Sequence, residues 1–251
     1  MPNANDIVTF HEPSVPEGQA PYVPGAGPSL NFDIVDWSDA WPGQFQLLAK
    51  EIEGALGWRA LVIEHVGSTS VPGLPAKPII DIDLIVADPN DEASYIPALE
   101  RAGFELRVRE PWRFGHRVLR HLEPACHLHV FAYDSPEVIK HRIFHDWLRA
   151  NTDDRVHYAD TKRKAAALSR AAGEHSMQYN ARKELVIKEI YRKAFIATGL
   201  LKAWELPEGA HRPAYRSPYG RSNSAQRTSD TQCSRLRKTA AGLRDLLESS
   251  L

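Results

Sequence analysis

The alternation of apolar and polar positions predicts a series of short strands in the first half of the chain. Residues 79–86 (IIDIDLIV) show the strongest strand pattern, because the run is rich in β-branched side chains and is bounded by proline and turn residues. Weaker patterns of the same kind cover residues 32–37, 60–66, 104–109, 114–120 and 125–133. We expect these strands to form a mostly antiparallel sheet.

Helical spacing of apolar residues appears before the second of these strands and again after Asp134. Phe45, Leu48, Ile52 and Leu56 recur at intervals of three and four, and Gly57 is placed to end that helix. A further helix is expected from about residue 91 to 103, and three more at 135–150, 152–172 and 176–197. A block of strands followed by a block of helices predicts the α+β class.

The two ends of the chain differ in composition from the middle. Residues 1–30 carry many Pro and Gly and few core-forming side chains, so we expect a disordered or loosely packed N-terminal arm. Residues 31–204 read as one folded domain. Residues 205–251 are rich in Ser, Arg and Pro, and we expect a polar basic tail that could end in one short amphipathic helix.

The overall composition excludes several classes of protein. The formal net charge of −1 argues against a chain that binds polyanions along its whole surface, and no RNA-binding module is recognisable, so nucleic acid is not an expected partner. No apolar run reaches the roughly 20 residues of a membrane helix. The two cysteines fit a reducing compartment. We therefore expect a cytoplasmic protein, and the oligomeric state stays open.

The candidate chemistry begins with Asp81 and Asp83 in the strongest strand. Alternate residues of a strand share a face, so both carboxylates project together while Ile80, Ile82 and Leu84 point into the core. Neighbouring carboxylates on a buried strand repel each other and lose hydration, so a positive group must offset them. A hard divalent cation such as Mg²⁺ fits this role. The alternative is that each aspartate pairs with a Lys or Arg.

A loop with the features of a phosphate-binding turn precedes this strand. Gly67 lets backbone N–H groups approach an anion, and Ser68, Thr69 and Ser70 add hydroxyl donors. Lys77 lies between the loop and the aspartates and is a further candidate for holding phosphate. No GxxxxGK[S/T] sequence occurs, so this is not a P-loop. A phosphate site beside two carboxylates is typical of phosphoryl or nucleotidyl transfer.

The run IEHVGSTSVPGLPAKPIIDIDLIV resembles the signature of GrpB domains, a family in the polymerase-beta-like nucleotidyltransferase superfamily. The resemblance extends from about residue 35 to 198 and includes CHLHVF, YADTK and YNARKELVIKEI. It implies a nucleotidyltransferase-like sheet with flanking helices and a C-terminal helical segment. It also implies that Gly67 and Ser68 bind phosphate and that Asp81 and Asp83 bind a metal ion. Lys162, Arg182 and Lys183 match positions where the family carries basic residues, and Lys183 is a candidate for the nucleotide site.

The strand CHLHVF departs from the wider superfamily, which places a third carboxylate there. This chain instead offers His127 and His129 on one face of the strand. With Asp81 and Asp83 they form a candidate ligand set that could hold Mg²⁺, Mn²⁺, Zn²⁺ or Fe²⁺. His129 could alternatively act as a general base, and both histidines could be purely structural.

These residues lead to three functional hypotheses. The first is a metal-dependent nucleotidyl- or phosphoryl-transferase that acts on a nucleotide or phosphorylated small molecule, with Asp81, Asp83 and His129 as its catalytic residues. The second is a noncatalytic accessory module, because the resemblance extends to domains attached to dephospho-CoA kinases. The third is a hydrolase or condensing enzyme that uses a His/Asp metal site. The sequence does not identify the acceptor.

Overall fold

The computed structural model describes residues 2–10, 13–30 and 32–202. The chain divides by its internal contacts into two compact units, Met1–Glu189 and Ile190–Leu251. The first unit holds a sheet of five strands: β1 (Val62–Val66), β2 (Ile80–Val86), β3 (Glu105–Glu110), β4 (His116–Leu122) and β5 (Ala125–Ala132). Its α-helices are α1 (Ala4–Val8), α2 (Ala40–Leu56), α3 (Ile96–Arg101), α4 (Pro136–Ala150), α5 (Thr152–Ala171) and most of α6 (Ser176–Ala197).

The strand order in the sheet is β1-β2-β5-β4-β3. Three of the pairings are antiparallel, and the central pairing of β2 with β5 is parallel. The expected class, α+β with a mostly antiparallel sheet and flanking helices, is confirmed. β3 and β4 follow β2 in the chain and lie toward one edge of the sheet, and β5 then returns to the position between β2 and β4. There the backbone groups of β5 form hydrogen bonds with both neighbouring strands.

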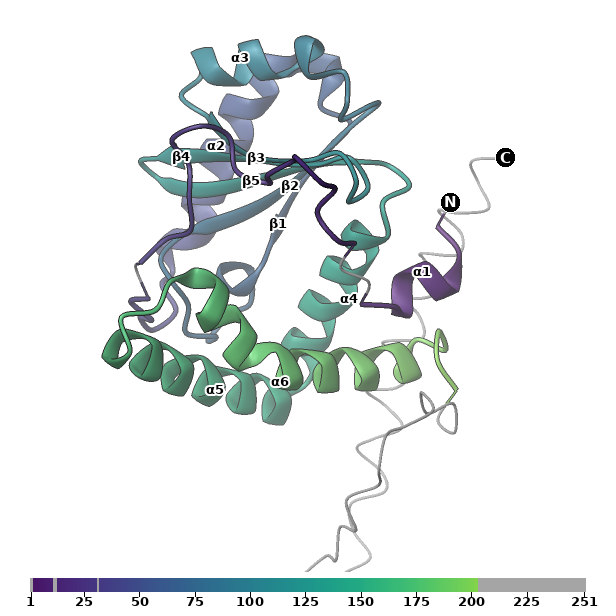
Figure 1. Ribbon diagram of the computed structural model, residues 1–251. Coiled ribbons are helices and arrows are strands. Elements are labelled where there is room, and N and C mark those ends of the chain that lie inside the picture. The colour runs from purple at the N-terminus through teal and green to yellow at the C-terminus, as the bar shows by residue number, and fades with distance from the viewer. Residues whose placement is uncertain (1, 11–12, 31, 203–251) are drawn as a thin grey trace, which may run out of the picture. The chain divides into compact units, whose positions relative to one another are not determined.

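One face of the sheet carries the main hydrophobic core. Ile80, Ile82, Leu84 and Val86 of β2 occupy this face and are at most 3% exposed. Leu128 and Val130 of β5 extend the same layer, and α2 and α3 cover it (Figure 1). In α2 the buried residues include Leu48, Ile52 and Leu56, which recur every four residues and so form one stripe toward the sheet. Gly57 ends the helix with φ 56°, as its position predicts.

The opposite face of the sheet is covered by α4, α5 and the first part of α6 (Figure 1). A small cluster of Ile85, Phe131 and Val138 joins this face to α4. A second cluster joins Phe32 to Ala165, Ala166 and Tyr179, and so ties the start of the folded domain to α5 and α6. The outer face of β2, which holds the two aspartates, therefore lies under a helical layer instead of facing solvent.

Two predicted elements are shorter in the structure than their sequence patterns suggest. Residues 32–37 form no strand beyond a single bridge between Val35 and Ala76, because the segment has only that one backbone partner. The expected helix at 91–103 consists of a 3₁₀ turn (Glu92–Ser94) and α3. Two further 3₁₀ turns are Gly57–Arg59 and Ser68–Ser70.

The N-terminal arm has defined contacts that its composition does not reveal. Ile7 of α1 is buried, and the carbonyl of Thr9 accepts a hydrogen bond from Lys140 of α4 at 2.8 Å. Farther along, Tyr22 forms a backbone bridge with Val108 of β3. This bridge covers part of an edge strand, whose unpaired backbone groups would otherwise be open to another chain.

The described part of the second unit is short. It holds the last residues of α6 and the turn that follows, up to residue 202. Within it the rings of Tyr191 and Phe195 lie 5.4 Å apart, and the Thr198 hydroxyl donates to the carbonyls of the preceding turn. The tail expected from residue 205 onward lies outside the described residues. In the part of the chain that the structure describes, none of the helices has the length and apolarity needed to cross a membrane.

We expect Leu84→Ala to lower the free energy of unfolding by about 2–5 kcal/mol, because Leu84 is fully buried and its truncation leaves a cavity. Urea denaturation measures this change. Leu185→Ala is the matched control, since Leu185 is 83% exposed and its truncation should change stability by less than about 0.5 kcal/mol. Equal effects of the two substitutions would contradict the described core.

Candidate functional site

Two acids and two histidines share the helix-covered face of the sheet. In the parallel pairing of β2 with β5, Asp81 is opposite His127 and Asp83 is opposite His129. The Asp81 carboxylate lies 3.3 Å from Nδ1 of His127, and the Asp83 carboxylate lies 2.8 Å from Nδ1 of His141 on α4. Each acid is thus paired with a histidine and not with an arginine. His141 was not singled out by the sequence pattern, because only the packing of α4 brings it to this face.

The two acids have different environments. Asp83 is fully buried, and its Oδ1 atom has no hydrogen-bond partner among the described residues. The Asp81 side chain is 32% exposed. Burial acts to raise the pKa of Asp81, but the hydrogen bond from His127 and the charges of His127, His129 and Lys77 outweigh it and lower the pKa. Asp81 therefore remains ionised and holds a negative charge at the centre of the site.

The loop after β1 packs directly on Asp81. Gly67 has φ 69° and ψ −167°, a conformation open almost only to glycine. A Cβ atom on Gly67 would lie 2.4 Å from Oδ2 of Asp81. The loop and the acid strand are therefore in direct contact at Gly67 and Asp81.

The hydroxyl groups of the loop have separate partners. Ser70 donates to the carbonyl of Gly67 at 2.7 Å, and Thr69 bonds His65 at 3.0 Å. The Ser68 side chain forms a hydrogen bond with Tyr158 of α5. Thr69 and Ser70 thus hold the shape of the turn in this structure, and phosphate binding by these two residues stays a prediction. Ser68 lies where α5 meets the turn.

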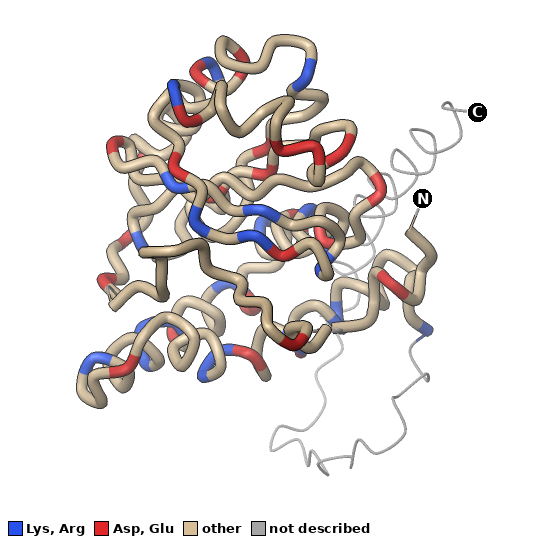
Figure 2. The backbone as a smooth tube through the Cα atoms, turned by 45° about the horizontal axis from the view of Figure 1, so that its top comes forward, with Lys and Arg blue, Asp and Glu red and all other residues tan. Residues whose placement is uncertain are grey.

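Three lysines surround two tyrosine rings near Asp81. Nζ of Lys183 lies 4.0 Å and Nζ of Lys77 lies 5.3 Å from the ring centre of Tyr179. Nζ of Lys162 lies 4.7 Å from the ring centre of Tyr158. Figure 2 shows Lys and Arg interleaved with Asp and Glu along the described backbone.

Burial makes these amines unusual. It lowers the pKa of Lys162 to about 6 and that of Lys183 to about 7, while the charge of Asp81 opposes both shifts. The pKa of Lys77 is lowered as well, by burial. Lys162 is only 2% exposed, and its Nζ atom has no hydrogen-bond partner among the described residues. A buried amine without a partner is costly to the folded state unless a ligand supplies the partner.

Lys162 is a site residue that the sequence analysis named only as a basic position of the family and did not select for the phosphate site. A signal was present, because Tyr158 and Lys162 on α5 have the same Tyr-x-x-x-Lys spacing as Tyr179 and Lys183 on α6. Residues four apart share a helix face. Two helices that present the same pair toward one strand suggest a common anionic ligand.

A fourth histidine, His116, extends the site toward the edge of the sheet. Nδ1 of His129 lies 3.0 Å from Nε2 of His116 on β4, and Nδ1 of His116 lies 2.8 Å from the carboxylate of Glu110 on β3. Burial lowers the pKa of His129 well below its ordinary value. His129 is therefore a neutral imidazole near pH 7.

The donor set can be compared with the needs of a metal ion. Within the described residues, no three His, Cys, Asp or Glu side chains are grouped so that they could hold a metal ion by themselves. Asp81 and the unpartnered Oδ1 of Asp83 do fit a cation that takes only two protein carboxylates and completes its shell with phosphate and water oxygens, as Mg²⁺ commonly does. Metal binding through His127 and His129 stays a prediction.

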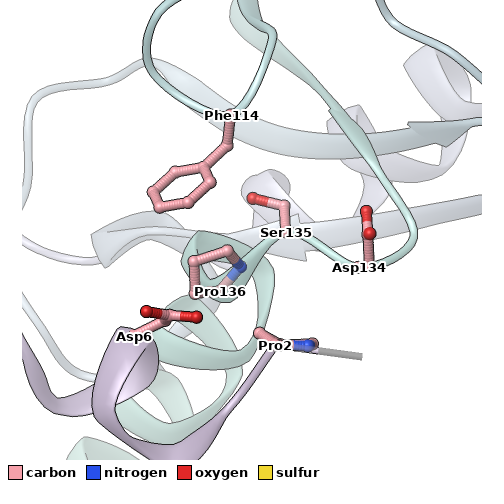
Figure 3. Close-up of a pocket in the computed structure, with 6 residues that line it drawn as sticks. All are labelled: Pro2, Asp6, Phe114, Asp134, Ser135 and Pro136. Carbon is pink, nitrogen blue, oxygen red and sulfur yellow. The ribbon is translucent and has the colours of Figure 1, made fainter.

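A separate pocket of about 330 Å³ lies where α1 approaches the start of α4. Its lining includes Asp6, Phe114 and Ser135 (Figure 3). It contains none of the acids, histidines or lysines described above, so we do not assign it to the same site.

The fold and the site together define an α+β protein. Its sheet carries two aspartates, each paired with a histidine, beside a cluster of buried lysines. The model of the GrpB protein family matches residues 31–193. This chain belongs to the GrpB family.

Relatives of known sequence or structure agree with this assignment. The chain is 45% identical over 166 residues to a UPF0157 protein of Halalkalibacterium halodurans, a match that covers 66% of this chain and 84% of the relative. The crystal structure of the conserved protein GrpB from Enterococcus faecalis aligns with a TM-score of 0.55 at 30% identity and covers 64% of this chain and 96% of that one.

A more distant match is to a dephospho-CoA kinase of Mycolicibacterium paratuberculosis, with 30% identity over 182 residues. It covers 62% of this chain but only 44% of the kinase.

We expect Gly67→Ala to destabilise the protein by about 1–3 kcal/mol or more, because alanine disfavours this backbone conformation and its methyl group would collide with Asp81. Thermal or urea denaturation measures the loss. Gly54→Ala within α2 is the control, since a Cβ there meets nothing within 4 Å and should leave stability equal or higher. If Gly67→Ala were as stable as the control, the close contact described between Gly67 and Asp81 would be contradicted.

We expect Lys162→Met to raise the free energy of unfolding, most strongly at low pH. The pKa of Lys162 is lower in the folded state (about 6) than in the unfolded chain (10.5), so the unfolded state binds more protons between these values. Wild-type stability should therefore rise with pH across this window, by at most about 1.4 kcal/mol per pH unit for one proton. The advantage of the methionine variant should shrink as pH rises from 6 to 10.

Urea denaturation at several pH values measures this difference. The exposed Lys164→Met is the matched control and should show no such pH-dependent gain. A methionine variant that is less stable than wild type at pH 6 would contradict the buried, unpartnered state of Lys162.

Proposed function

We propose that this protein is a metal-dependent nucleotidyl- or phosphoryl-transferase whose site holds the phosphate groups of a nucleotide or phosphorylated small molecule. One observation carries the proposal: two buried polar atoms, Oδ1 of Asp83 and Nζ of Lys162, have no hydrogen-bond partner in the described part of the chain, and both lie near Asp81. A ligand that brings phosphate oxygens and a divalent cation satisfies both atoms at once.

The lysines hold the phosphate groups in this proposal. A bound phosphate restores the charge of Lys162 and Lys183, because a nearby anion favours the protonated amine. Backbone N–H groups of the turn at Gly67 and the Ser68 hydroxyl would bind the same phosphate groups. Tyr158 positions Ser68 through their hydrogen bond.

Asp81 and Asp83 would hold Mg²⁺ or Mn²⁺, which would neutralise negative charge on the transferring phosphate. Asp83 is oriented by His141 and Asp81 by His127. These histidines keep the acids in place through hydrogen bonds, a role that outer groups commonly fill at metal sites. His129 lies opposite Asp83 in the parallel pairing, and its imidazole would serve as proton acceptor.

A second candidate is a noncatalytic accessory module. It is favoured by the match to a dephospho-CoA kinase, which covers less than half of that enzyme. In this case the lysine cluster would bind a phosphorylated ligand without transferring any group, and the acids would shape the site. Both candidates share ligand binding and differ in turnover.

We expect nucleoside triphosphate together with Mg²⁺ or Mn²⁺ to stabilise the wild-type protein, by about 2.7 kcal/mol at a ligand concentration of 100 Kd. Thermal shift and calorimetric titration with each nucleotide, with and without metal, measure this. Asp83→Asn should abolish the metal-dependent part of binding, and Lys162→Met should weaken nucleotide binding with or without metal. Asp91→Asn, an exposed aspartate outside the site, is the matched control.

Product analysis separates the candidates. Release of pyrophosphate indicates nucleotidyl transfer, release of nucleoside diphosphate indicates phosphoryl transfer, and binding without turnover favours the accessory module. If no nucleotide or phosphorylated compound stabilised the protein with any of these metals, the proposal would be wrong.

A further inference from the structure

Glu110, His116 and His129 form a continuous hydrogen-bonded chain across three neighbouring strands. Glu110 is on β3, His116 on β4 and His129 on β5, and all three lie on the face that carries Asp81 and Asp83. The two contacts measure 2.8 Å and 3.0 Å, within ordinary hydrogen-bond range. The chain therefore runs from the β3 side of the sheet to the acid pair in its middle.

Packing holds the two rings in place. The ring of His116 is stacked on Phe131 with centres 4.8 Å apart and an interplanar angle of 12°. The ring planes of His116 and His129 are nearly parallel, with an interplanar angle of 8°. The rings of His129 and His141 pack edge to face, with ring centres 6.2 Å apart. The side chains of His116 and Glu110 are only 12% and 16% exposed. A half turn of either ring would keep these ring contacts but place carbon atoms where the nitrogens now bond, so it would break the hydrogen bonds.

The chemistry of the chain decides which nitrogen carries each proton. Burial acts to raise the pKa of Glu110, but the hydrogen bond from His116 and the nearby charge of Arg113 act against it and the pKa is lowered, so the carboxylate is ionised and can only accept. His116 must donate from Nδ1, and in its neutral form Nε2 is then an acceptor. His129 must donate from Nδ1 to that acceptor, which leaves Nε2 of His129 with the lone pair.

We propose that Glu110 and His116 are positioning residues that fix His129 in the Nδ1–H tautomer, so that its Nε2 atom is the proton acceptor of the site. This inference rests on the proposed transferase function for its catalytic meaning. Nε2 takes the proton of the acceptor hydroxyl while the hydroxyl oxygen forms a bond to phosphorus. The bond from phosphorus to the leaving phosphate breaks, and the leaving group departs with the electron pair.

This arrangement explains why a histidine, His129, suits the second histidine position of CHLHVF. A carboxylate at this position would stand beside Asp81 and Asp83 and add a third negative charge to a buried face. A neutral imidazole adds no charge, and the remote Glu110 supplies the orientation that selects its basic nitrogen.

The test is nitrogen NMR of histidine-labelled protein at pH 8, without any ligand. Proton–nitrogen correlations distinguish the Nδ1–H and Nε2–H tautomers, and His129→Gln assigns the signals among the 11 histidines. We expect wild-type His129 as the Nδ1–H tautomer. We expect His116→Phe, which keeps a ring stacked on Phe131, to remove that preference. Glu110→Gln should weaken it.

His121→Phe is the control, because His121 is on the same strand but bonds the carbonyl of Pro124 and faces the other side of the sheet. It should leave the His129 signals unchanged. An Nε2–H tautomer in the wild type, or an Nδ1–H tautomer that persists fully in His116→Phe, would overturn the proposal.

The proposed tautomer and the proposed transferase function are tested by separate experiments. The NMR experiment needs no substrate, so it tests the chain of hydrogen bonds even if no nucleotide binds. Where turnover is found, His116→Phe should lower kcat at least tenfold with little change in KM, because the variant alters proton transfer and not ligand binding. If kcat stayed unchanged while the tautomer changed as expected, the hydrogen bonds from Glu110 and His116 would have a structural role only.

Discussion

The parallel pairing of β2 with β5 is the interaction on which the site depends. It sets Asp81 beside His127 and Asp83 beside His129, residue by residue, on one face of the sheet. A shift of one residue would turn every one of these side chains into the apolar core on the other face. The core residues Ile82, Leu84, Leu128 and Val130 prevent such a shift, because they are fully buried in the register observed. The hydrophobic core thus fixes the positions of the polar groups.

Two opposite costs of burial meet around Asp81. Burial opposes the negative charge of the acids and the positive charge of the lysines. The fold resolves the first with histidine hydrogen bonds to both carboxylates. It leaves the second only partly resolved, since Lys162 has aromatic contact but no hydrogen-bond partner among the described residues. A residue that lowers stability in this way is commonly retained because it serves a function. A phosphate ligand would supply the missing hydrogen-bond partner of Lys162.

The same sheet face also connects the site to the edge of the fold. The hydrogen bonds from Glu110 through His116 reach His129 over three strands, and the N-terminal arm pairs with Val108 on the outermost of these strands. The arm precedes the residues that match the family model. It therefore adds a covering segment beside the end of the chain of hydrogen bonds while the shared domain supplies the site itself.

The sequence by itself determined the local features of this protein. β-branched alternation determined β2 and the shared face of Asp81 and Asp83, helical spacing determined α2 and its end at Gly57, and the quoted motifs indicated the family. These follow from interactions between residues close in the chain. The candidate residues Gly67, Ser68, Lys77, His127, His129 and Lys183 also came from short motifs, and the structure brings all of them into the neighbourhood of Asp81.

Only the tertiary structure decided which distant groups complete the site. The pairing of His141 with Asp83, the burial of Lys162 and the contact of His116 with His129 each join segments whose separation in the chain carries no periodic signal. The parallel order of β2 and β5 likewise depends on two intervening strands. Hydrogen-bond partners and lost hydration depend on packing, because a side chain's charge and proton are set by whatever surrounds it in space.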